Sequence, residues 1–116
     1  MASYKELDVY KRAYRLSLGL HQFCFSLPKN LQYDLADQIR RASRSVPSNI
    51  AEGYSRNKSE KDTINFLKSA LGSNDEILFN LQFMKDSNLI SEKDYNLFFD
   101  EYTICGKQLS KLIKSF

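Results

Sequence analysis

The stretch QIRRASRSVPSNIAEGYSR, residues 38–56, carries four arginines around a proline inside a helical pattern. Apolar residues recur in and just before it at spacings of three or four: Leu35, Ile39, Ala42, Val46 and Ile50. This spacing places them on one face of an α-helix. We therefore predict a helix from about residue 31 into the fifties, with its arginines on the opposite face.

Pro47 lies inside this predicted helix, and the apolar pattern continues past it. Proline removes one backbone hydrogen bond and clashes with the carbonyl four residues earlier, so we expect a kink around residues 43–47. Asn49 and Glu52 have the spacing of a capping pair. A break in the helix with a restart at Asn49 is therefore the alternative to the kink.

Three further helices are predicted from similar signals. The first, about residues 5–27, stops before Pro28, because the residue preceding a proline is disfavoured in a helix. The tetrapeptide SEKD occurs at 59–62 and at 91–94, each time before an apolar run with helical spacing. A serine followed by acidic residues suits a helix start. The chain is thus predicted to be one all-α domain, residues 1–116, forming an up-and-down antiparallel four-helix bundle with a kinked second helix.

Composition narrows the class of protein. The sequence has no apolar run long enough for a membrane span and no secretory signal at its start, so we expect a soluble, cytoplasmic chain without a membrane partner. Its net charge of +3 is mild and does not by itself indicate a nucleic-acid binder. Cys24 and Cys105 lie far apart at core-like positions, which favours two buried thiols over a disulfide.

The first helix has two apolar faces. One, assigned to the core, carries Leu7, Tyr10, Tyr14, Leu18 and Phe25. The opposite face carries Val9, Leu16, Leu20, Phe23 and Leu27, and further apolar residues behind the main seams of the last two helices are Phe79, Phe83, Leu97 and Ile104. Each helix of a four-helix bundle buries one face, and soluble monomers rarely expose large apolar patches. This second set therefore predicts an oligomer interface, with scattered surface hydrophobics as the alternative.

The basic residues of the second helix are candidates for binding phosphate. Arg40, Arg41 and Arg44 fall within an arc of about 100° opposite the apolar face. Arg56 and Lys58 extend the positive charge, so residues 38–58 hold five basic residues against one acid. Guanidinium groups bind phosphate oxygens with two hydrogen bonds. RNA or DNA is therefore a predicted partner of this surface.

Two other interpretations of these charges remain open. A charged outer face keeps a bundle helix soluble, and Asp37 can pair with Arg41 as Glu52 can with Arg56. The surface can also serve a structural or protein-interaction scaffold that binds no nucleic acid. Weaker candidates for additional phosphate contacts are Lys11, Arg12, Arg15, Lys107, Lys111 and Lys114.

No catalytic, metal or cofactor site is predicted. His21 and Cys24 are two possible ligands, fewer than a zinc site needs. Arg15 and His21 have the spacing of an element found in some helical ribonucleases, which makes an RNA-cleaving enzyme a third hypothesis. Residues six apart on one helix are separated by about 240°, so they do not converge on one phosphate without a second subunit. The favoured interpretation is a non-enzymatic protein.

The block at residues 38–56, followed by FLKSALGSNDE, resembles the signature of the bacterial four-helix bundle family named for proteins encoded in 23S ribosomal RNA intervening sequences. The opening LDVYKRAYRLSLGL is similar to that family's first helix, with Tyr10 where tryptophan is usual. Positions that match the family pattern are Gln38, Arg40, Arg41, Pro47, Asn49, Glu52, Gly53, Gly72, Ser73 and Glu76. Asn74 and Asp75 depart from it. Because Asn74 falls on a core seam, it needs a polar partner there, such as a hydroxyl of another helix or subunit.

The resemblance implies a barrel-like homopentamer. Related proteins include the accessory factors of diversity-generating retroelements, which are basic pentamers that associate with a reverse transcriptase and nucleic acid. The resemblance thus adds a reverse transcriptase as a possible partner, should the protein be associated with a retroelement. No biochemical activity is established for most of the family.

Overall fold

The computed structural model describes residues 3–116 and contains four α-helices. They are α1 (Asp8–Cys24), α2 (Leu35–Gly53), α3 (Glu60–Asp86) and α4 (Glu92–Lys114), with short 3-10 helices η1 (Tyr4–Glu6) and η2 (Lys29–Leu31). No strand occurs among the described residues. The prediction of an all-α fold with four helices is confirmed.

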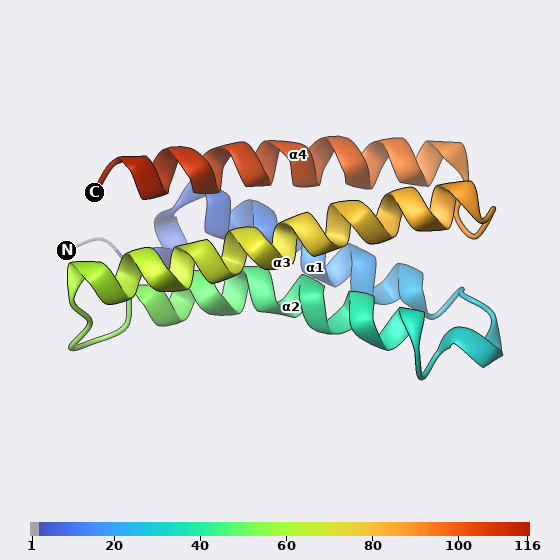
Figure 1. The fold of residues 1–116 in the computed structure, drawn as a ribbon, viewed down its shortest axis with the longest axis horizontal. Coiled ribbons are helices and arrows are strands. Elements are labelled where there is room, and N and C mark those ends of the chain that lie inside the picture. The colour runs from blue at the N-terminus through green and yellow to red at the C-terminus, as the bar shows by residue number, and fades with distance from the viewer. Residues whose placement is uncertain (1–2) are drawn as a thin grey trace.

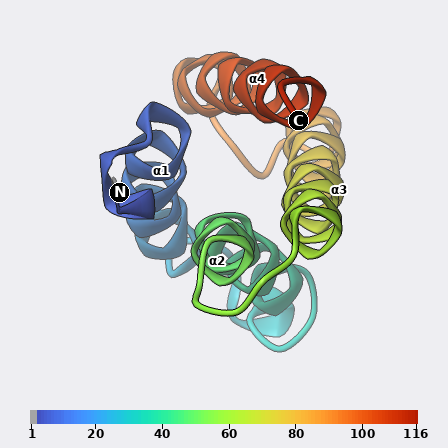
Figure 2. The ribbon, with the colours of Figure 1, turned by 90° about the vertical axis from the view of Figure 1, so that its left-hand side faces the viewer.

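The helices form an elongated bundle with extents of 43 × 24 × 19 Å. Each helix packs against the next in the chain, and α4 also packs against α1, so the four surround one core (Figure 2). The three connections lie at alternate ends of the bundle (Figure 1). Consequently α2 is flanked by α1 on one side and by α3 on the other, which determines where each of its arginines lies.

The two SEKD copies begin helices as predicted. The Ser59 hydroxyl accepts a hydrogen bond from the Asp62 amide at 3.1 Å, and the Asp62 carboxylate accepts one from the Ser59 amide, also at 3.1 Å. These hydrogen bonds lower the pKa of Asp62. At α4, Ser91 accepts in the same way from the Asp94 amide. The serine side chains thus satisfy amides that a helix start leaves without intrahelical partners.

Helix α2 continues through Pro47, which is buried. The alternative of a break with a restart at Asn49 is therefore wrong, whereas the kink stays a prediction. The Asn49 side-chain amide donates to the backbone carbonyl and to the hydroxyl of Ser45, both at 2.9 Å, instead of capping a new helix. The Ser45 hydroxyl also lies 2.8 Å from that of Ser73 on α3. Asn49 thereby takes part in a polar seam between α2 and α3.

The buried face of α1 is the opposite of the predicted one. Its buried apolar residues, together with Leu27 just beyond its end, are Val9, Ala13, Leu16, Leu20, Cys24 and Leu27. Tyr14, Leu18 and Phe25, which the sequence pattern places in the core, are 50%, 57% and 59% exposed. The small side chains of Ala13 and Cys24 complete an uninterrupted three-four pattern along the buried stripe, and small residues let neighbouring helices approach closely.

Because the buried face of α1 differs from the predicted one, several residues assigned to the oligomer interface lie in the core. These members are Val9, Leu16, Leu20 and Leu27, and their assignment to the interface is wrong. Phe23 is half-buried, with its ring centroid 6.1 Å from that of Phe98. The remaining members are exposed and stay candidates: Phe79 (68%), Phe83 (49%), Leu97 (60%) and Ile104 (40%).

Both cysteines are buried free thiols, as predicted. Burial raises the pKa of Cys24 to about 11 and that of Cys105 to about 12, so neither is a thiolate near neutral pH.

A buried amide joins α3 to α4. Asn74 is fully buried, and its side-chain nitrogen donates to the backbone carbonyl of Tyr102 at 2.9 Å. The partner of the Asn74 amide nitrogen is therefore a main-chain oxygen of α4 and not the hydroxyl of another helix or subunit. A Cβ atom added to Gly106 would lie 3.0 Å from the same nitrogen, so a side chain at this position would press on the Asn74 amide. Gly72, in the middle of α3, has open space around its Cα.

The two helical glycines make a matched pair of tests. Gly72→Ala should raise the free energy of unfolding by about 0.5–1 kcal/mol, because alanine favours the helix. Gly106→Ala gains the same propensity but presses on a buried, hydrogen-bonded amide, and should lower the free energy of unfolding by about 1 kcal/mol or more. Urea titrations of both variants measure the difference. Equal stabilisation by the two substitutions would show that Asn74 moves aside freely.

Candidate nucleic-acid interface

The predicted arginine surface of α2 divides into parts with different environments. Arg40 is half-buried and turns toward the connection between α1 and α2. Its guanidinium donates to the side-chain oxygen of Gln32 at 3.0 Å and to the Gln32 backbone carbonyl at 2.9 Å, and lies 5.4 Å from the centre of the Phe25 ring. The prediction that Arg40 points freely outward is wrong, because the connection folds back over it.

Gln32 links this arginine to the end of α1. Its side-chain amide donates to the backbone carbonyls of Cys24 at 2.8 Å and Leu27 at 2.9 Å. Carbonyls at the end of a helix lack intrahelical partners and carry partial negative charge. Arg40 therefore orients Gln32, and the pair closes the end of α1.

Two other basic residues are paired within the chain. Arg41 forms an ion pair with Asp37 at 2.8 Å, as the spacing predicted, but its side chain stays 66% exposed. Lys58 lies 3.7 Å from Glu52 and 5.0 Å from the centre of the Phe66 ring. Glu52 thus pairs with Lys58 and not with Arg56. Exposed pairs of this kind contribute less than about 1 kcal/mol, so a phosphate can replace the carboxylate.

Arg44 lies at an apolar groove between α1 and α2. The groove, about 290 Å³ in volume, is lined by Tyr10, Tyr14, Ser17, Leu18, Arg44, Pro47, Ser48 and Ala51. Tyr10 and Tyr14 stack with ring centroids 6.0 Å apart. Within residues 3–116, neither Arg44 nor Arg56 forms an ion pair. Arg44 therefore combines an unpaired charge with an exposed apolar surface.

The additional basic residues of α1 are also engaged. The Arg12 and Arg15 guanidinium groups both donate to one carboxylate oxygen of Glu101 on α4, at 2.8 and 2.7 Å. Arg12 further donates to the side-chain oxygen of Gln108 at 3.2 Å. These contacts fasten α1 to α4. By contrast, Lys107, Lys111 and Lys114 form no ion pair among the described residues and border a groove between α3 and α4.

The structure does not bring the ribonuclease-like pair together. Arg15 is held by Glu101 on α4, whereas the His21 ring packs edge-on against Phe25, with centroids 5.2 Å apart. Nowhere in residues 3–116 do three histidine, cysteine or acidic side chains gather as metal ligands would. In the same range, no helix has the length and apolar character to cross a bilayer.

Two features of the site were not found from the sequence. The contact between Gln32 and Arg40 involves an irregular segment, where no periodic pattern predicts which side chains meet. The apolar groove was missed because the two faces of α1 were interchanged. A signal for it was present, since Ser48 and Ala51 place small side chains beside Arg44 on the outer side of α2.

The fold and the exposed residues define a small all-α four-helix bundle with a basic second helix and an apolar groove beside it. The chain belongs to the 23S rRNA-intervening sequence protein family, whose model matches residues 5–111. A similar solved structure is that of a protein of unknown function from the S23 ribosomal protein family of Bacteroides thetaiotaomicron VPI-5482. It has 23% sequence identity and a TM-score of 0.82, with 91% of this chain and 95% of that chain covered. No match was found among curated proteins.

The environment of the arginines predicts different effects on stability. Arg40→Ala should lower the free energy of unfolding by about 1–3 kcal/mol, because it removes charged hydrogen bonds that hold Gln32. Arg40→Lys should recover only part of the loss, since lysine lacks the planar fork of donors. The control Arg41→Ala removes an exposed pair and should change stability by about 0.5 kcal/mol or less. Chemical denaturation of the three variants provides the measurement, and equal losses for Arg40→Ala and Arg41→Ala would contradict the assignment.

Proposed function

We propose that this protein is a non-enzymatic homo-oligomer, a pentamer, that binds RNA or DNA through the basic face of α2. The observation that supports this most directly is the position of Arg44. Its side chain lines the apolar groove between α1 and α2 and has no acidic partner among the described residues. A neighbouring subunit that covers the groove therefore comes to lie beside a free guanidinium group.

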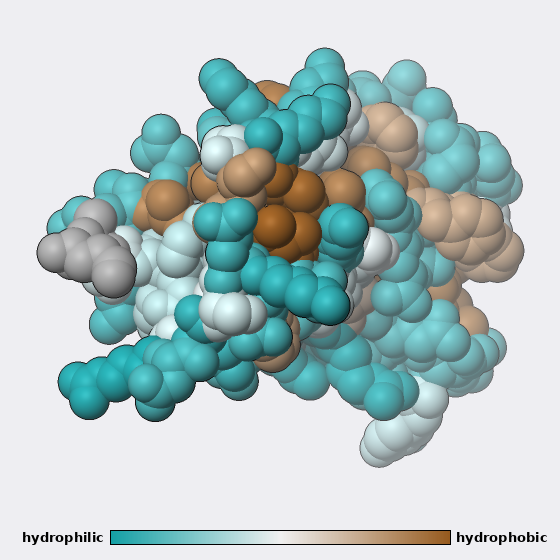
Figure 3. Space-filling view, turned by 60° about the vertical axis from the view of Figure 1, so that its left-hand side comes forward, coloured by the Kyte–Doolittle hydropathy of each residue, from teal (hydrophilic) through white to brown (hydrophobic). Residues whose placement is uncertain are grey.

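The exposed apolar surface supports self-association. The groove contains Leu18 and Tyr14, each at least half exposed, whereas α3 presents Phe79 and Phe83 one turn apart. Figure 3 shows hydrophobic surface gathered in patches between hydrophilic side chains on one side of the bundle. We propose that the two phenylalanines of one subunit enter the groove of the next. A contact between two different surfaces is head-to-tail and closes into a ring when the rotation permits.

The number of subunits and the biological context rest on the family. Five subunits are proposed because the resemblance to this family implies a barrel-like homopentamer. The name of the family links it to 23S rRNA, which makes RNA the first nucleic acid to test. If the gene lies beside a reverse transcriptase, that enzyme is a further proposed partner.

The phosphate-binding residues of this proposal are Arg41, Arg44 and Arg56, with Lys58 secondary. Arg41 exchanges Asp37 for phosphate at little energetic cost, because an exposed ion pair is weak. Arg40 is left out because it holds the end of α1. A ring repeats these residues in every subunit, and contacts that are weak singly add up when several act on one strand.

A second candidate function is a structural or protein-interaction scaffold. It is favoured by the pairing of Arg41 with Asp37 and of Lys58 with Glu52, which leaves less free positive charge than the sequence indicates. Under this alternative the chain still self-associates but has no salt-sensitive affinity for nucleic acid. RNA binding and its dependence on salt therefore separate the two functions, whereas mass tests the self-association that they share.

The self-association predicts a change of mass on substitution in the groove. Light scattering at micromolar concentration should give about five times the 13.5 kDa chain mass for the native protein. Leu18→Glu and Phe79→Glu should each shift the mass toward the monomer, since both place a charge in an apolar contact. Tyr33 is 96% exposed in the connection after α1, so Tyr33→Glu is the control and should leave the mass unchanged. A monomeric native protein would refute the oligomer, and an unaffected mass in Leu18→Glu would refute this interface.

Nucleic-acid binding predicts a steep dependence on salt. A labelled RNA of about 20 nucleotides should lose most of its affinity between roughly 50 and 200 mM salt, because binding releases counterions. The triple variant Arg41→Ala, Arg44→Ala, Arg56→Ala should bind weakly with a flatter slope. Its control, Lys107→Gln, Lys111→Gln, Lys114→Gln, removes the same charge from α4 and should bind like the native protein.

Two results would count against the nucleic-acid proposal. Binding that is absent or insensitive to salt favours the scaffold. Cleavage of the RNA during long incubation, lost in His21→Ala, would overturn the non-enzymatic assignment.

A further inference from the structure

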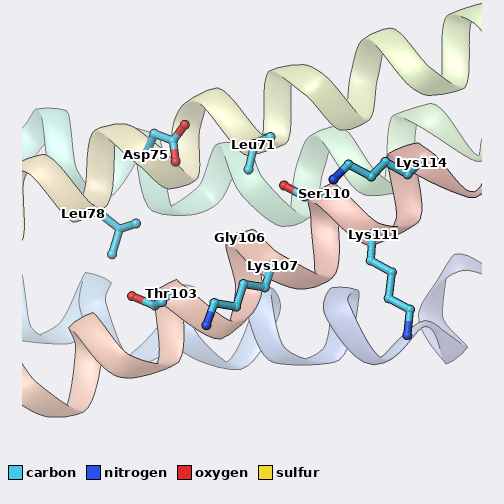
Figure 4. A pocket seen from close by; sticks show the side chains of 9 residues that line it. All are labelled: Leu71, Asp75, Leu78, Thr103, Gly106, Lys107, Ser110, Lys111 and Lys114. Carbon is cyan, nitrogen blue, oxygen red and sulfur yellow. The ribbon is translucent and has the colours of Figure 1, made fainter.

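A second groove lies on another side of the bundle, between α3 and α4, with a volume of about 590 Å³. Leu71, Asp75 and Leu78 line it from α3. Thr103, Gly106, Lys107, Ser110, Lys111 and Lys114 line it from α4. Figure 4 shows Leu71 and Leu78 extending from α3 toward α4, with the lysines on α4 itself. The groove thus has an apolar strip bordered by positive charge.

The packing of α3 against α4 creates this groove. Gly106, which lies against the Asn74 side chain, contributes no side chain to the groove. Its neighbours one turn away in each direction, Thr103 and Ser110, are small. The Thr103 hydroxyl donates to the Phe99 carbonyl at 2.7 Å and is therefore satisfied within its own helix. The floor of the groove therefore carries only small side chains, and the Thr103 hydroxyl does not need a hydrogen bond from a ligand.

The charges around the groove are asymmetric. Lys107, Lys111 and Lys114 span about 10 Å along α4, at spacings of four and three residues. None has an acidic partner within the described part of the chain. The dipole of α4 favours cations in its last turn, which accounts for Lys111 and Lys114 but not for Lys107. Asp75 supplies one negative charge on the opposite wall.

These features fit a peptide helix better than a nucleic acid. A phosphate backbone gains nothing from Leu71 and Leu78 and is repelled by Asp75. The lining residues include no aromatic ring on which a base can stack. An amphipathic helix places apolar residues on the leucines and acidic residues, three or four apart, opposite the lysines. A basic residue on the other edge of such a peptide helix can form an ion pair with Asp75.

We propose that the groove between α3 and α4 binds an acidic amphipathic helix of a partner protein, through apolar contacts with Leu71 and Leu78 and ion pairs with Lys107, Lys111 and Lys114. Leu71 lies at the level of Gly106, so the two leucines, about two helical turns apart, and the three lysines follow one another along the groove (Figure 4). This site is separate from α2 and does not depend on the proposed nucleic-acid function.

The test uses a labelled amphipathic peptide of about 16 residues, with leucines along one stripe and glutamates along its flank. Fluorescence anisotropy should show that it binds the full-length protein more tightly than a peptide of scrambled order and equal charge. Lys107→Glu with Lys111→Glu should weaken binding about tenfold or more. Lys11→Glu with Lys29→Glu changes the net charge equally at exposed sites elsewhere and should leave the affinity within about twofold.

A further variant tests the apolar strip without a change of charge. Ser110→Phe fills the groove floor and should also weaken peptide binding about tenfold, while circular dichroism reports an intact bundle. Equal affinity for the patterned and scrambled peptides would overturn the proposal, and so would equal losses in the two lysine pairs. Loss of RNA binding in Lys107→Glu with Lys111→Glu, with peptide binding unchanged, would reassign the groove to nucleic acid. If the native protein binds no RNA, or if only the arginine variants of α2 lose RNA binding, the proposed peptide site is unaffected, because peptide binding is measured separately.

Discussion

A four-helix bundle buries one face of each helix, and α1 enters this bundle with two apolar faces. The face that contains Ala13 and Cys24 is buried, because these small side chains complete a stripe along which the neighbouring helices approach closely. Burial of this stripe turns Tyr14 and Leu18 outward, over α2. Because the other face of α1 is buried, Tyr14 and Leu18 are free to line the groove beside Arg44, on which the proposed assembly depends.

Polar contacts between the helices then fix how the elements meet. Asn74 binds a main-chain carbonyl of α4 at the level of Gly106, so the two helices are held in one register. Gln32 and Arg40 close the end of α1 and hold the connection to α2. Polar groups that are buried, like Asn74, or partly buried, like Gln32 and Arg40, are costly when unpaired, so these contacts disfavour other packings. They also show that an arginine in a basic cluster can belong to the framework of the fold.

The basic residues consequently serve different purposes on different sides of the bundle. Arg12 and Arg15 share Glu101 and fasten α1 to α4. Arg44 stands beside an apolar groove that a second subunit can cover, whereas Lys107 borders a groove with a leucine strip and one carboxylate. Because these surroundings differ, the two surfaces suit different partners, although both are positively charged. Net charge alone, at +3, distinguishes none of these roles.

The sequence by itself determined the four helices, the capping at Ser59 and Ser91 and the two buried thiols. The helices follow from the three-four spacing of apolar residues, and the caps from a serine three residues before the amide that it binds. The burial of the two thiols follows from their positions on the apolar side of helical patterns. Only the tertiary structure decided which face of α1 is buried, because both faces have helical apolar spacing and the choice depends on how closely α2 and α4 approach. It also decided that Arg40 contacts Gln32, since an irregular connection places its side chains by packing and not by a repeating pattern.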